Sequence, residues 1–145
     1  MLFGMPSLLE NKTLEEDVAL CERLGLSFVE LNMNYPNYQV EKLENAEYFR
    51  ATAKKAGVFY SIHLPENLDI ADFNPLVSAA YRETVRRAID LAIETGMPVL
   101  NMHMNHGIHI TLPDRKVKMY ERNREEYLDS FRTFCRMCVE TAGNA

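Results

Sequence analysis

The sequence has few cysteines and no secretion signal, and both absences bear on where the protein works. Its 3 cysteines among 145 residues are too few, and odd in number, for a disulfide framework, which is typical of a reducing compartment. The N-terminus lacks the charged start and cleavage site of a secretory signal, with no basic residue before Lys12. The uncharged stretch over residues 95–113 contains His, Asn, Gly and Pro, which make it a poor membrane span. We therefore expect a cytoplasmic protein without a membrane partner.

The sequence also lacks any block of positive charge. Its 16 Lys and Arg stand against 21 Asp and Glu, which gives a formal net charge of −5. This balance argues against binding to nucleic acid mainly by charge, although it is compatible with a local basic patch. The glycine-rich loops that bind nucleotides are absent as well. Because no linker rich in Pro, Gly or Ser divides the chain, we expect a single domain over residues 1–145.

A short apolar segment followed by a helix recurs four times along the chain. Strands are predicted over residues 2–7, 27–32, 58–63 and 98–103. The helices are predicted from a capping box at Thr13 and Glu16 to Gly25, over 41–56 before Gly57, from Asn74-Pro75 to Gly96, and over 121–142. No hairpin signal separates the strands, so the pattern predicts helical crossovers and a parallel sheet. The fold class is therefore α/β.

Polar residues share one face of three predicted strands. Successive strand residues point to opposite faces, and the polar positions that share a face are Glu30 and Asn32, Ser61 and His63, and Asn101 and His103. Strands covered on both faces are usually continuous apolar runs instead. The polar side chains gather toward the C-terminal strand ends, where a (β/α) barrel places its active site. The pattern favours a barrel-type sheet over a doubly wound one.

Two histidines, His63 and His103, end the third and fourth predicted strands. Neighbouring parallel strands lie roughly 5 Å apart, so the two imidazoles could meet and hold a divalent metal. A lone histidine at a strand end is usually a structural hydrogen-bonding residue, and the pairing is what favours a metal. His106 and His109 lie in the next loop and could add a ligand, an acid or base, or a substrate contact. Each is equally compatible with a solvated loop histidine.

The predicted loop over residues 104–120 is long for a connection between a strand and a helix. Loops of this length in a compact domain are typical of lids and binding segments. Its Arg115, Lys116 and Lys118 could contact a phosphate or carboxylate of a substrate, although short charged runs are usually only solvated.

Cys135 and Cys138 have the spacing of half a zinc site or a redox pair. They fall on the predicted apolar stripe of the last helix, whose other members are Leu128, Phe131 and Ala142. We therefore interpret both cysteines as core residues.

The sequence resembles the xylose isomerase-like barrels, which include sugar isomerases, sugar epimerases and the endonuclease IV group of DNA repair enzymes. The resemblance lies in the opening LFGMPSLLENKTLEEDVALCERLGLSFVELN and in the segments SIHLPENLDI and PVLNMHMNHG. In the endonuclease IV branch, histidines in H-x-P and LNxH contexts are metal ligands, which match His63 and His103. That branch continues with Pro-Gly where this chain has Met104-Asn105. In the isomerase and epimerase branch the strand-three histidine contacts substrate, and Glu30 would lie at the mouth of the same pocket.

The resemblance implies four of the eight βα units of a TIM barrel. A complete barrel has roughly 250 residues, so we expect the N-terminal half of a longer barrel. A barrel completed by a homodimer and a small doubly wound domain are the alternatives. The principal acid and base carboxylates would then lie outside this chain.

The implied function is a metal-dependent isomerase or epimerase acting on a sugar or sugar phosphate. The alternatives are an endonuclease IV-like zinc phosphodiesterase acting on DNA and a non-catalytic half-barrel that serves binding or assembly. We expect His63 and His103 to bind a divalent ion (Zn, Mn, Mg or Co). Substrate-binding roles are expected for Glu30, Asn32, His63 and His106, and His106 is also the catalytic candidate.

Overall fold

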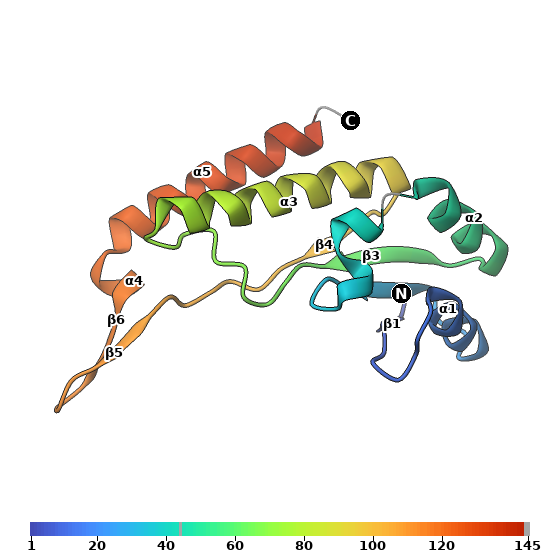
Figure 1. Cartoon of the computed structure of the whole chain (residues 1–145), viewed down its shortest axis with the longest axis horizontal. Coiled ribbons are helices and arrows are strands. Elements are labelled where there is room, and N and C mark those ends of the chain that lie inside the picture. Colours follow the sequence, from blue (N-terminus) through green and yellow to red (C-terminus); the bar gives the residue numbers. More distant parts are fainter. Residues whose placement is uncertain (44, 144–145) are drawn as a thin grey trace.

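The computed structural model describes residues 1–43 and 45–143, and its centre is a four-stranded parallel sheet (Figure 1). The strands follow the order of the chain and are β1 (Gly4–Pro6), β2 (Phe28–Asn32), β3 (Phe59–His63) and β4 (Leu100–Asn101). The helices are α1 (Leu14–Arg23), α2 (Ala46–Ala56), α3 (Pro75–Thr95), α4 (Met119–Arg122) and α5 (Arg124–Gly143). Parallel strands in sequential order, joined by helices, form one half of a (β/α) barrel. The predicted α/β fold is therefore confirmed.

The helices begin at the residues whose side chains can cap them. Thr13 accepts a hydrogen bond from the Glu16 backbone N–H at 3.3 Å, and the Asn74 side chain accepts one from the Leu76 N–H at 3.1 Å. The Glu16 carboxylate accepts from the backbone N–H of Lys12 at 2.6 Å, one residue before the N-cap. The predicted capping box is thus half formed, because the reciprocal bond goes to the neighbouring residue.

The second helix begins later than predicted. The first two residues of the predicted helix, Glu41 and Lys42, lie instead in η2 (Val40–Lys42), a single turn of 3₁₀ helix that follows another such turn, η1 (Pro36–Tyr38), and α2 begins at Ala46. Its end agrees with the prediction, because Gly57 takes the left-handed conformation that closes a helix, and Gly96 does the same after α3.

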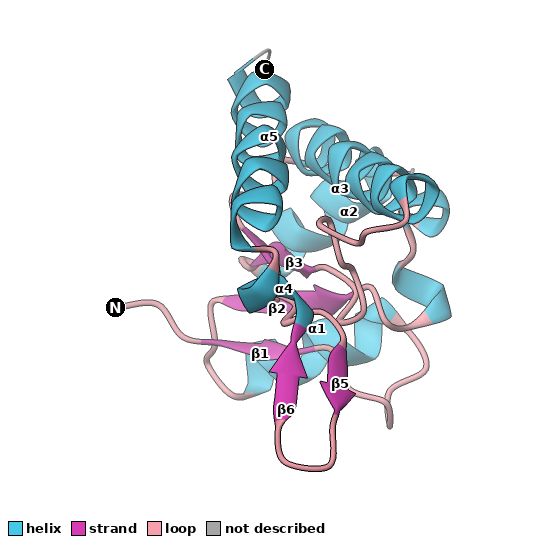
Figure 2. Cartoon of the chain, turned by 90° about the vertical axis from the view of Figure 1, so that its left-hand side faces the viewer, coloured by secondary structure: helices cyan, strands magenta, loops and turns pink. Residues whose placement is uncertain are grey.

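The two faces of the sheet differ as the alternation of residues predicts. Val29, Leu31, Tyr60 and Ile62 are at most 3% exposed and belong to the core between the sheet and the helices. On the opposite face, which we call the open face, the register pairs Glu30 with Ser61, Asn32 with His63, and His63 with Asn101. In Figure 2, α2, α3 and α5 lie together above the strands of the sheet. The polar residues therefore share one side of the sheet.

The segment after β4 is predicted to be a loop over residues 104–120, and the structure differs from this prediction. It forms an antiparallel hairpin of β5 (His109–Thr111) and β6 (Lys116–Lys118), which extends beyond the strand ends (Figures 1 and 2). The hairpin turn is closed by a hydrogen bond from the Leu112 N–H to the Arg115 carbonyl at 2.8 Å. Pro113 and Asp114 occupy the centre of this turn, where both residue types are favoured.

The last predicted helix is divided into α4 and α5, and Cys135 is exposed instead of buried in the core. The inner row of α5 contains Tyr127, Phe131 and Phe134, whose rings contact one another along the helix, and α5 packs against α3. Cys135 lies to one side of this row and Cys138 is half-buried. None of the described helices is long and apolar enough to cross a lipid bilayer.

Candidate functional site

His63 and His103 lie side by side at the C-terminal end of the sheet. Their ring centroids are 5.0 Å apart, with an angle of 56° between the ring planes. Nδ1 of His63 is 2.9 Å from the carbonyl oxygen of Leu64. Only a protonated nitrogen can donate to a carbonyl, so in the neutral imidazole this contact places the proton on Nδ1 and the lone pair on Nε2. His63 can therefore bind a metal or accept a hydroxyl proton through Nε2.

A carboxylate and an amide meet on the open face. Nδ2 of Asn101 on β4 is 3.5 Å from Oε1 of Glu30 on β2, across the intervening strand β3. Ser61, the register partner of Glu30, is 3% exposed, and its hydroxyl has no hydrogen-bond partner within the described residues. A carboxylate that accepts and an amide that donates are the groups that recognise hydroxyls. The sequence pattern placed Asn101 on this face, but only the fold shows its contact with Glu30.

Asn32 lies at the end of β2, where its side chain shapes a turn. Its Oδ1 accepts hydrogen bonds from the backbone N–H of Asn34 at 2.9 Å and from the Asn34 side chain at 2.8 Å. Asn34 in turn accepts from the backbone N–H of Glu66 at 3.0 Å. Asn32 therefore links the loops that follow β2 and β3. A contact between its Nδ2 group and a substrate stays a prediction.

His106 lies in a cleft of about 390 Å³ beside the hairpin. The charged and aromatic residues that line this cleft are His106, Lys118, Tyr120, Glu121, Arg124 and Tyr127. Asn105 holds the loop in place, because its amide donates to the carbonyl of Leu68 at 2.7 Å. We call this space the hairpin cleft. Among the described residues, it combines side chains from the loop after β4, from β6, from α4 and from the start of α5.

Tyr120 forms the buried wall of the hairpin cleft. Its hydroxyl donates to Asp69 at 2.7 Å, and its ring stacks on Tyr127 at 4.5 Å. Burial and the hydrogen bond to Asp69 raise the pKa of Tyr120 above its ordinary value, so the phenol stays neutral. A Cβ atom on Gly107 would lie 2.7 Å from the Tyr120 ring. The backbone of the loop therefore rests directly on this ring.

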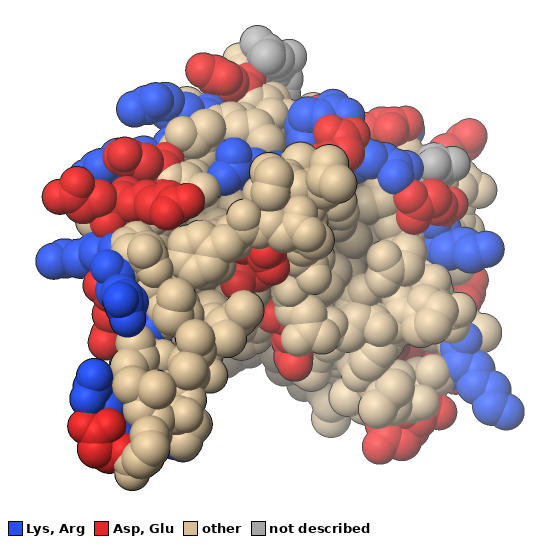
Figure 3. Space-filling model, turned by 60° about the vertical axis from the view of Figure 1, so that its left-hand side comes forward, with Lys and Arg blue, Asp and Glu red and all other residues tan. Residues whose placement is uncertain are grey.

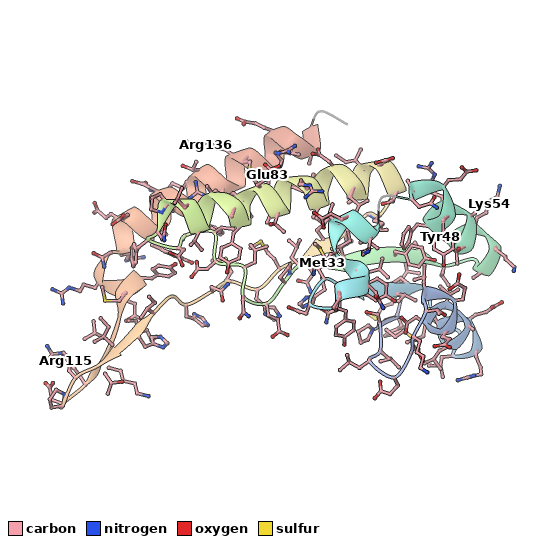
Figure 4. The ribbon with its side chains drawn as sticks, in the orientation of Figure 1. Met33, Tyr48, Lys54, Glu83, Arg115 and Arg136 are labelled. Carbon is pink, nitrogen blue, oxygen red and sulfur yellow. The ribbon has the colours of Figure 1, made fainter. Side chains whose placement is uncertain are left out.

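The basic residues expected to meet an anion separate in the structure. Arg115 lies at the tip of the hairpin (Figure 4) and forms an ion pair with Asp114 at 2.6 Å. Lys118 lines the hairpin cleft, whereas Lys116 is exposed and is not among the lining residues. Arg124 joins Lys118 there, although no local sequence pattern singles it out. Only the folding of α4 against the loop after β4 brings it to the cleft.

Metal binding has to be judged from the donors that are present. Within residues 1–43 and 45–143, no group of three or more His, Cys, Asp or Glu side chains is arranged to hold a metal ion. Protein zinc sites use three or four such ligands. His63 and His103 supply two nitrogen donors, so the described residues fit part of a metal site and not a whole one.

Sequence comparison places the chain in a family. The model of the xylose isomerase-like TIM barrel family matches residues 18–143. The chain belongs to this family. No curated protein sequence gives a significant match. The expected membership and the half-barrel arrangement of this xylose isomerase-like chain are therefore both confirmed.

Three solved structures illustrate the fold similarity. A D-tagatose 3-epimerase-like protein has a TM-score of 0.73 and 23% sequence identity, and the similarity covers 99% of this chain and 49% of the epimerase-like protein. The D-psicose 3-epimerase of Clostridium cellulolyticum H10 has a TM-score of 0.70 and 9% sequence identity, covering 98% of this chain and 50% of the epimerase. The 3-keto-D-glucoside 4-epimerase of E. coli has a TM-score of 0.72 and 16% sequence identity, covering 97% of this chain and 53% of the epimerase. The xylose isomerase-like chain thus spans about half the length of each of these structures.

Proposed function

We propose that this chain forms half of a sugar isomerase or epimerase, with the substrate bound at the C-terminal ends of β2, β3 and β4. The observation that carries the proposal is the His63–His103 pair on the same sheet face as the Glu30–Asn101 pair. Barrels of this architecture have their active sites at that end of the strands. The similar structures are epimerases named for tagatose, psicose and a keto-glucoside, which supports a sugar as the substrate class.

Each residue has a role that follows from its chemistry. Glu30 accepts hydrogen bonds from sugar hydroxyls, and the Asn101 amide donates to a sugar oxygen. His63, through Nε2, and His103 act as two ligands of a divalent ion or as contacts to a substrate oxygen. Such an ion, when bound, polarises a carbonyl or hydroxyl oxygen of the substrate. His106 is the one acid or base candidate that we assign to this half of the site.

The open face requires a cover for this function. The rings of Phe28 and Phe59 stack on it at 5.1 Å, and Val99 is 51% exposed. In the described sheet β1 and β4 are both edge strands, and unprotected edges beside apolar side chains favour association. We propose that a second set of four βα units, from a second copy or a longer chain, completes the barrel. That half would supply the remaining metal ligands and the carboxylates that move a proton.

The metal-ligand role is tested by titrating Zn²⁺ and Mn²⁺ into the chain and following the histidine ring signals by NMR. We expect one ion to perturb His63 and His103 together. His63→Ala and His103→Ala should each weaken binding at least tenfold, because each removes one of two donors. His109→Ala is the matched control, since it removes an exposed imidazole from the hairpin, and it should change the affinity by less than twofold.

Unchanged metal binding in both strand-end variants would refute the metal-ligand role and favour a non-catalytic half-barrel. Turnover of ketoses and of DNA with abasic sites is measured with the completed barrel, formed by a second copy or by the longer chain. Epimerisation of a ketose without DNA cleavage is the result that we expect. Cleavage of the DNA would instead favour the endonuclease IV-like alternative.

A further inference from the structure

We propose that the hairpin cleft binds the anionic group of a sugar substrate, either a phosphate or a carboxylate. The inference rests on the proposed function and narrows its substrate class to acidic sugars. It is carried by the uncommitted charge in the cleft, by its aromatic wall and by its position next to the strand ends.

Positive charge is available inside the hairpin cleft. The side chain of Arg124 makes no ion pair or hydrogen bond within the described part of the chain, whereas Arg115 and Arg132 are both paired with a neighbouring aspartate. A guanidinium presents five N–H groups in a fork that matches phosphate or carboxylate oxygens. His106 and Lys118 line the same space. The cleft can therefore present three donors to one anion.

One carboxylate, that of Glu121, opposes this charge among the lining residues that the structure describes. It forms an ion pair with Lys118 at 2.8 Å, and the two side chains are 51% (Lys118) and 70% (Glu121) exposed. Exposed pairs of this kind are weak, because water screens both charges. An anionic ligand can displace Glu121 from Lys118 at little cost, so the pair does not block the site.

The wall and the size of the cleft suit a sugar that carries such a group. Tyr120 and Tyr127 are stacked with 28° between their rings, and Tyr127 is half-buried, so part of an aromatic surface faces the cleft. Small-molecule sites are commonly about 300–1,000 Å³ and lined by aromatic groups with a few polar ones. The hairpin cleft, at about 390 Å³, lies at the lower end of this range.

The cleft is close enough to the strand ends for one ligand to reach both. His103 and His106 are separated by only two residues, so their Cα atoms lie at most about 11 Å apart. Asn105 between them is anchored to the loop after β3. A sugar bound beside His103 could therefore extend its anionic group toward His106 and Arg124. Figure 3 shows the hairpin standing out from the body, with a hollowed surface between them.

The test is equilibrium binding of four probes to the chain by calorimetry: D-fructose 6-phosphate, D-galacturonate, inorganic phosphate and neutral D-fructose. We expect at least one of the two acidic sugars to bind tenfold or more tightly than fructose. Arg124→Gln should remove this difference, and Arg124→Lys should restore part of it, because it keeps the charge and loses the fork. Circular dichroism of each variant verifies that it is folded.

The matched control is Arg136→Gln, which makes the same change of charge on the same helix. Twelve residues along α5 correspond to about 18 Å, and Figure 4 shows Arg136 on the part of α5 away from the hairpin. Its binding should stay within twofold of the unmodified chain. Equal affinity for fructose and both acidic sugars would overturn the proposal, as would an equal loss in Arg136→Gln.

Phosphate and carboxylate are distinguished by which acidic sugar depends on Arg124. Failure here is also distinguishable from failure of the proposed function. Epimerisation of a ketose, together with acidic sugars that bind no more tightly than fructose, would refute the anion site and keep the function. Arg124-dependent binding without turnover of any sugar by the completed barrel would keep the site and refute the function.

Discussion

Two buried tyrosines, Tyr60 and Tyr38, should respond in opposite directions to the same substitution. Tyr60 on β3 is 3% exposed, and its hydroxyl has no hydrogen-bond partner in the described residues. Tyr38 is 8% exposed, and its hydroxyl donates to Asp17 at 2.8 Å. Tyr→Phe removes one oxygen in each case and keeps the ring. The comparison therefore isolates the hydroxyl from the packing.

The expected magnitudes follow from these contacts. A buried polar group without a partner costs about 1–3 kcal/mol, so Tyr60→Phe should raise the free energy of unfolding by about 1 kcal/mol. Its ring keeps the edge contact with Phe49 at 5.9 Å. A hydrogen bond to a charged acceptor contributes about 1.5–3 kcal/mol, so Tyr38→Phe should lower the free energy of unfolding by about 2 kcal/mol. The two variants should then differ by about 3 kcal/mol.

Urea unfolding followed by circular dichroism measures both values, and the slope with urea should stay constant in both variants. One kcal/mol corresponds to roughly 3 °C in Tm for a chain of this size. A Tyr60→Phe variant that loses 1 kcal/mol or more would refute the reasoning, because its hydroxyl would then have a stabilising partner.

Tyr60 should also make the stability of the folded chain depend on pH. Burial raises the pKa of Tyr60 above its ordinary value of about 10. The unfolded chain therefore loses this proton first, and the stability present below pH 10 declines as the pH rises above it. For one such group the loss between pH 10 and pH 11 is about 1 kcal/mol. Tyr60→Phe should reduce the decline by that amount.

Two further predictions concern the loops around the site. Gly107 has a φ of +68° and lies against Tyr120, whereas a Cβ on Gly25 would meet nothing within 4 Å. Gly25→Ala should lower the free energy of unfolding by about 1–2 kcal/mol, and Gly107→Ala should lower it by more. Equal losses in thermal melts would contradict the close contact between Gly107 and Tyr120. Asp17 is 1% exposed and accepts three hydrogen bonds, so Asp17→Ala should lower the free energy of unfolding by about 3 kcal/mol or more. Asp90→Ala breaks an exposed ion pair and should lower the free energy of unfolding by under about 1 kcal/mol. Similar losses in the two aspartate variants would argue against this buried network.

Some contacts at the strand ends can be predicted from local sequence patterns. Alternation along β2 and β3 predicted that Glu30 and Ser61 share a face, and strand adjacency predicted that His63 meets His103. Both inferences depend only on the twofold period of a strand and on the spacing of parallel strands. The same reasoning misplaced Cys135, because several rotations of α5 about its axis satisfy its apolar residues until its packing partner is known.

The sequence by itself determined the parallel βα repeat, the helix ends at Asn74, Gly57 and Gly96, and the polar character of the open face, because each depends on residues close together along the chain. Only the tertiary structure decided that Asn101 reaches Glu30 across β3 and that Arg124 joins His106 at the hairpin cleft. These contacts connect separate elements or depend on the side-chain conformations that packing selects. Local periodicity carries no information about either.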